Sequence, residues 1–154
     1  MLKKPSLAHF APNLSLADFK KAFQESDCFA QLVGYYPDHV EKGKCVYIFE
    51  SNENHMNPYG ILHGGALYAA MDSSQGLAVH TYLDLEKFWG ITAEASIRYK
   101  QPFTKGKITI KTEIKEHKKT ILYVISNAYD ENNNLLAALE QKWMVLKRIS
   151  PECL

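Results

Sequence analysis

The feature that most constrains the fold of this chain is the stretch from Gly64 to Tyr82, which has almost no polar side. Small or apolar residues fill most of its helical positions: Ala66, Leu67, Tyr68, Ala69, Ala70, Met71, Leu77, Ala78 and Val79. A helix that is apolar nearly all round is normally buried. The sequence therefore predicts a long central helix over residues 64–82, which other elements must cover.

Strand-like patterns lie on both sides of this helix. Residues 44–50 are rich in β-branched and aromatic types, and residues 91–100 alternate between apolar and polar side chains, which predicts a half-buried strand. Three further runs, at 107–116, 120–129 and 135–147, are separated by short turn-forming segments. Short connections between consecutive strands predict an antiparallel meander.

Together these elements predict an α+β fold in which an antiparallel β-sheet wraps around the long central helix. The chain has 154 residues, of which 46% are hydrophobic, so it can bury one sizeable core. We expect a single domain over 1–154 with its core at about 43–148. An N-terminal helical segment is expected at about 15–33, with Ser15 as its N-cap and Asp18 three residues later.

Composition argues against several classes of protein. Basic and acidic side chains nearly balance, 18 against 17, without the basic excess that nucleic-acid binding usually requires. The first ten residues lack the apolar run of a secretory signal, and no stretch is apolar enough for a membrane span. Cys28, Cys45 and Cys153 are odd in number and lack Cys-x-x-Cys spacing, which argues against a disulfide framework and a zinc site. We expect a cytoplasmic protein without a nucleic-acid partner, a membrane span or a metal.

The segment that leads into the predicted helix contains a candidate for catalysis, His63-Gly64-Gly65. Two glycines at a helix start let a substrate approach the backbone closely. The unpaired amide hydrogens there, helped by the helix dipole, can bind a developing oxyanion. Gly64 is the candidate donor. The alternative is that the glycine pair simply forms a tight turn.

Asp72 is the second candidate, because it lies within the small and apolar run of the predicted helix. An unpaired carboxylate in such surroundings would cost several kcal/mol, so it should face a cavity, a partner or a substrate. The alternative is an exposed or salt-bridged aspartate. A helix rises about 1.5 Å per residue, which separates Gly64 from Asp72 by roughly 12 Å. If both act on one carbonyl group, the carboxylate must come from a second subunit, which predicts a site at a two-fold dimer interface.

At these residues the sequence resembles the hotdog-fold acyl-CoA thioesterases of the PaaI-like (phenylacetate-pathway) group. The resemblance covers roughly residues 45–148. It rests on Asn57, the Gly60-Ile-Leu-His63-Gly64-Gly65 loop, the acidic residue nine positions after the histidine, and the strand from Gly90 to Tyr99 that leads into Pro102 and Gly106.

The resemblance implies hydrolysis of an acyl-CoA to free acid and coenzyme A by a homodimer or homotetramer. It implies that Asp72 is the catalytic carboxylate, as general base or nucleophile, and that Gly64 supplies the oxyanion amide. Asn57 would position the water or the thioester, and His63 would support the loop. Gly65 and Thr92 would contact the substrate. A thioester is already activated, so this chemistry requires no metal or cofactor.

Two alternatives remain open at this point. The first is a sensor of the same fold that binds an acyl thioester without catalysis, because a fold alone does not fix a function; it would need no carboxylate at position 72. The second is a hydratase or dehydratase that pairs His63 with Asp72 around the α and β carbons. The resemblance favours hydrolysis over both. The acyl group, whether aryl, medium-chain or long-chain, is not identified by the sequence.

Overall fold

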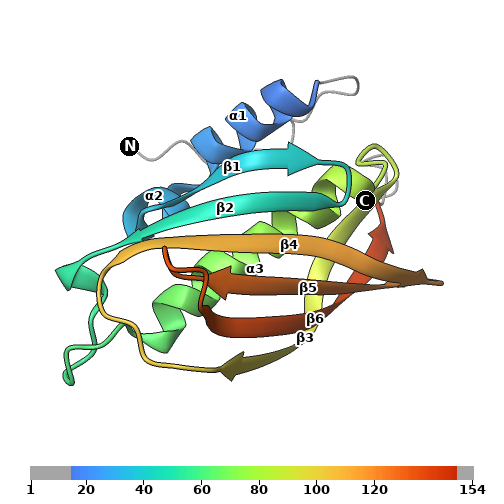
Figure 1. The fold of residues 1–154 in the computed structure, drawn as a ribbon. Helices are drawn as coiled ribbons and strands as arrows, with labels where there is room; N and C mark the ends of the chain where they lie inside the picture. The colour runs from blue at the N-terminus through green and yellow to red at the C-terminus, as the bar shows by residue number, and fades with distance from the viewer. Residues whose placement is uncertain (1–14, 149–154) are drawn as a thin grey trace.

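The structure, a computed structural model, describes residues 15–148. The elements in chain order are α1 (Leu16–Ser26), α2 (Cys28–Val33), β1 (Tyr35–Glu41), β2 (Lys44–Ser51), the 3-10 helix η2 (Glu53–His55), α3 (Gly64–Tyr82), β3 (Phe88–Tyr99), β4 (Gly106–Lys118), β5 (Ile121–Tyr129) and β6 (Leu135–Lys147). The strands form one antiparallel sheet in the order β1-β2-β4-β5-β6-β3. The long helix α3 lies across one face of the sheet, and α1 and α2 lie beside β1 (Figure 1). The predicted sheet around a central helix is confirmed.

Helix α3 has the predicted bounds and supplies the centre of the core. Its buried residues are Leu67, Ala70, Met71, Ser74, Gln75, Gly76, Leu77, Ala78 and Val79. They pack against the inward side chains of the sheet, among them Tyr47, Phe49, Ile108, Ile110 and Leu139. Burying each large apolar side chain stabilises the fold by about 1.5–3 kcal/mol relative to leaving it exposed. Among the helices of residues 15–148, we find none long and apolar enough to cross a membrane.

The N-terminal helical segment consists of two short helices, α1 and α2. Ser15 is the N-cap of α1, because its hydroxyl accepts the Asp18 N–H at 3.1 Å, as predicted. Asp27 is the C-cap of α1 and the N-cap of α2. The C-cap of α2 is Gly34, which has the left-handed conformation at φ 89°. The edge strand β1 follows immediately. It was missing from the prediction, since its sequence contains Pro37, which favours edge positions and weakens a strand pattern.

The predicted meander is correct for β4, β5 and β6 but wrong for β3. Strand β3 pairs with β6 at the far edge of the sheet, and β2 pairs with β4 instead. Three strand spacings, about 14 Å, separate β3 from β4. The short connection at 100–105 can span this distance, because an extended residue reaches about 3.3 Å. A short connection therefore does not ensure that consecutive strands are neighbours.

The half-buried character expected for β3 is also wrong for the single chain. Only Gly90 is buried along the strand. A bulge between Thr92 and Glu94 shifts the register, so Ile91 and Ile97 face opposite sides of the sheet although both fit the sequence alternation. The same bulge places Thr92 opposite the inward-facing Trp143.

A test of this packing compares two glycines. A Cβ at Gly90 would lie 2.6 Å from Cγ1 of the fully buried Val79, so Gly90→Ala should lower the free energy of unfolding by about 1–3 kcal/mol through overpacking. A Cβ at Gly76 would meet Trp143 at an ordinary 3.5 Å. Gly76→Ala should therefore leave stability unchanged or raise it by about 0.5–1 kcal/mol, because alanine favours helix. Urea unfolding measures both, and equal effects would contradict the close approach of β3 to α3.

Candidate functional site

The start of α3 leaves one backbone amide available. His63 is the N-cap, and its Nδ1 accepts the Gly65 N–H at 2.9 Å. The His63 N–H donates to the His55 carbonyl at 2.8 Å, which anchors the loop before the helix. Within residues 15–148 we find no hydrogen bond for the N–H of Gly64. The first amide of a helix has no partner inside the helix, so this donor can bind a ligand.

Tyr99 packs closely against position 64. Its hydroxyl donates to the Gly64 carbonyl at 2.8 Å, and a Cβ at position 64 would lie 2.9 Å from the Tyr99 ring. Tyr99 thus holds the peptide that follows Gly64 and lies beside the free amide. The sequence reasoning placed Tyr99 on a strand but assigned it no role in the site, because its contact with residue 64 depends on tertiary structure.

Asn57 shapes the loop that leads to this helix start. Its side-chain oxygen accepts the Tyr59 N–H at 2.9 Å and the Ile61 N–H at 3.4 Å, and its own N–H donates to the Ile61 carbonyl at 2.8 Å. A further hydrogen bond holds the loop, in which the Leu62 N–H donates to the Phe103 carbonyl at 2.7 Å. The structure therefore places Asn57 as a loop-forming residue at the helix start. Any contact of its amide NH₂ with a substrate stays a prediction.

Asp72 lies two turns further along α3 and is half-buried. Its Oδ1 accepts the Gln141 amide at 2.6 Å and the Thr92 hydroxyl at 3.3 Å. No described residue forms a salt bridge with it or donates to its Oδ2. The expectation that this carboxylate would find a partner is met by two neutral donors, and one carboxylate oxygen stays available.

The sequence reasoning missed Gln141 and Trp143, two inward residues of β6. Gln141 is only 3% exposed, its Oε1 accepts the Trp143 indole N–H at 2.8 Å, and its Nε2 also lies 3.3 Å from the Tyr68 hydroxyl. Burial, followed by the charge of Asp72, raises the pKa of Tyr68 above its usual value. A glutamine among the otherwise apolar inward positions of the strand was the signal that could have found this pair.

The candidate residues thus form two separate groups on the chain, called half-sites below. Asn57, His63, Gly64 and Gly65 gather at the start of α3, while Asp72 lies further along α3 and meets its partners on β3 and β6. Eight residues of continuous helix separate the two half-sites by about 12 Å. Within one subunit the structure does not bring Gly64 and Asp72 together.

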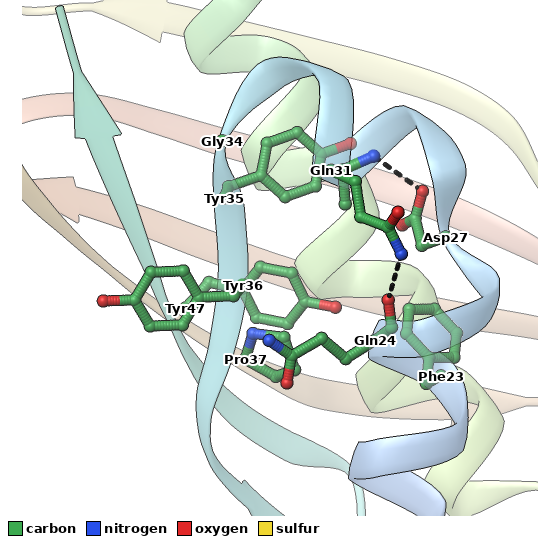
Figure 2. A pocket seen from close by; sticks show the side chains of 10 residues that line it. Phe23, Gln24, Asp27, Gln31, Gly34, Tyr35, Tyr36, Pro37 and Tyr47 are labelled. Atoms are coloured by element: carbon green, nitrogen blue, oxygen red, sulfur yellow. Dashed lines mark hydrogen bonds between the residues drawn. The ribbon is translucent and has the colours of Figure 1, made fainter.

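A cavity of about 320 Å³ lies elsewhere, between α1, α2 and the first two strands (Figure 2). Tyr35 lines it and hydrogen-bonds Ser73 at 2.8 Å, and burial raises the pKa of Tyr35 to about 12. Asp72 contacts β3 and β6, at the opposite edge of the sheet from β1. This cavity is therefore not part of the two half-sites.

Solved structures with this architecture identify the fold as the hotdog fold. A thioesterase from Haemophilus influenzae, HI1161, is similar with a TM-score of 0.79 at 18% identity over 98% of this chain and 99% of its own. The PaaI protein from the phenylacetic acid degradation operon of E. coli is similar with a TM-score of 0.77 at 17% identity over 86% and 96% of the two chains.

Sequence comparison then identifies the family. The chain belongs to the DUF4442 family, described as a domain of unknown function, which matches residues 17–145. A relative from Saccharolobus solfataricus, named "Putative esterase SSO1253", is 32% identical over 141 residues, covering 92% of each chain. The family match includes α1 and α2, which lie before the segment covered by the sequence resemblance.

Proposed function

We propose that this protein is an acyl-CoA thioesterase, with Asp72 as its catalytic carboxylate and the Gly64 N–H as its oxyanion donor. The observation that carries the proposal is the pair of free groups: an unbonded amide at a helix start and an unbonded Oδ2 on a half-buried aspartate. The names of the relatives, an esterase and a thioesterase among them, support the same class of reaction.

The reaction needs only these groups and water. The thioester carbonyl oxygen accepts the Gly64 N–H, which stabilises the negative charge that develops there. Asp72 removes a proton from water as the water oxygen attacks the carbonyl carbon. The tetrahedral intermediate then expels the coenzyme A thiolate, which takes up a proton, and the free acid leaves. Direct attack by Oδ2, followed by hydrolysis of the anhydride, uses the same residues.

We infer that each site combines two subunits across β3. This strand is one of the two edges of the sheet, the other being β1 beside α1 and α2, and its unpaired backbone groups favour pairing with another strand. Tyr99, which contacts Gly64, and Thr92, which contacts Asp72, lie toward opposite ends of β3. Antiparallel pairing of two such edges about a two-fold axis would bring the Gly64 end of one subunit toward the Asp72 end of the other.

The position of His63 does not favour the hydratase alternative. Its Nδ1 accepts the Gly65 N–H, so this ring nitrogen is occupied in capping α3. A capping role for His63 agrees with this hydrogen bond.

Replacement of the carboxylate tests the proposed base. Asp72→Asn keeps the shape of the side chain but cannot accept a proton, so thiol release should fall about a hundredfold or more. The assay is thiol release from a panel of aryl-, medium-chain and long-chain acyl-CoAs. Asp84→Asn is the control, because Asp84 lies after the end of α3 and forms a surface ion pair with Lys87. A native protein that binds these thioesters but releases no thiol would support the sensor instead.

The oxyanion donor can be removed without removing the helix start. Proline is well tolerated at the first position of a helix and has no N–H. The extended conformation of His63, at φ −64° and ψ 124°, suits a residue before proline. Gly64→Ala is the matched control, because it adds a Cβ at the same place beside Tyr99 but keeps the amide. We expect kcat of Gly64→Pro to lie about a hundredfold below that of Gly64→Ala; equal values would remove the amide from the mechanism.

Mixing of two inactive variants tests the shared site. Unfolding and refolding Asp72→Asn with Gly64→Pro at equal amounts should restore about a quarter of native activity, because half of the dimers are mixed and each mixed dimer has one intact site of two. Each variant refolded alone is the control. If the two groups acted within one subunit, the mixture would be no more active than the two variants measured separately.

A further inference from the structure

We propose that Gln141 is a positioning residue for Asp72 and that Trp143 fixes the orientation of its amide. The inference rests on the proposed function and extends it to two β6 residues outside the His63-Gly64-Gly65 and Asp72 pattern.

The Gln141 amide is oriented from both of its ends. The indole N–H of Trp143 can only donate, and it lies 2.8 Å from Oε1 of Gln141. An ionised carboxylate can only accept, and Oδ1 of Asp72 lies 2.6 Å from Nε2. Rotating the amide by half a turn would place two donors together at one end and two acceptors at the other. A single orientation of Gln141 therefore satisfies both neighbours.

The indole that orients this amide is itself held between β6 and α3. Its N–H also lies 3.3 Å from Oε1 of Gln75, a fully buried residue three positions after Asp72 on the helix. Nε2 of Gln75 donates to the Leu139 carbonyl at 3.3 Å. Trp143 is 6% exposed. The indole therefore connects the helix that carries Asp72 to the strand that carries Gln141.

This arrangement determines which carboxylate oxygen can react. Both donors, Gln141 and Thr92, bind Oδ1, so Oδ2 is left for water or the thioester carbon. Thr92 lies on the exposed edge strand at 3.3 Å, whereas Gln141 is buried and closer. Gln141 is thus the stronger constraint on the rotation of the carboxylate. Because Gln141 reaches Asp72 from the core, its loss should change turnover rather than substrate binding.

The test compares Gln141→Leu with native protein and Asp72→Asn in the same thiol-release assay. We expect kcat of Gln141→Leu to fall about tenfold to hundredfold, as for residues that orient a reactive group, with KM within about twofold of native. Trp143→Phe removes the indole N–H but keeps an aromatic ring, and it should lower kcat by a smaller factor of about three to ten. Glu140→Gln is the matched control, because Glu140 precedes Gln141 on β6 and is exposed on the other face.

Each outcome decides one claim. Native turnover that is lost in Asp72→Asn but kept in Gln141→Leu, or a change in KM alone, would overturn the positioning role and leave the thioesterase standing. A native protein without turnover would overturn the thioesterase and this inference with it. Circular dichroism and the elution volume of each variant confirm that it is folded; if Gln141→Leu does not fold, Trp143→Phe decides the question.

Discussion

The burial of α3 against the sheet is the constraint on which the rest of the structure depends. Because the helix is covered on most sides, each polar side chain that it carries must find a partner inside the protein. Ser74 does so with Thr112 at 2.7 Å, and Thr112 in turn bonds Ser126 at 2.7 Å. Asp72 does so with neutral donors from the two strands at one edge. The burial of this apolar helix thus determines which of its positions can hold a polar side chain.

The rigidity of the same helix separates the two groups that the proposed reaction requires. The candidate oxyanion amide lies at a helix start, because the first N–H groups of a helix have no partner within it. Asp72 lies eight residues further along, where β3 and β6 can reach it. A straight helix cannot bring these two positions together, so a reaction that uses both depends on a second copy. The geometry of one helix therefore connects the proposed mechanism to the proposed assembly.

The sequence predicted the parts of the molecule that depend on local rules. The central helix follows from its continuous run of small and apolar residues, the Ser15 cap from its spacing to Asp18, and the strands from their alternation or their β-branched and aromatic content. The position of Gly64 at the helix start was also readable, because glycine and a capping residue identify such ends. Pairing of β3 with β6 was not readable, because it depends on how the chain crosses the sheet after α3. The contact of Gln141 with Asp72 was not readable either, because it joins residues far apart in sequence; the glutamine at an inward position of β6 was its one signal.

The bulge in β3 makes the observed faces of the strand differ from those that the sequence alternation predicts, and it also brings a residue to the candidate site. From Ile91 to Tyr99 the sequence alternates without a break, yet the unpaired Ala93 changes which face the side chains occupy. Thr92 gains its place beside Asp72 through this shift, while Ile91 becomes 38% exposed on the outer face. Tyr99, at the end of the same strand, is 52% exposed. Exposed apolar side chains on an unpaired edge strand are unfavourable in water. The composition of β3 is better matched to the second subunit of the proposed shared site.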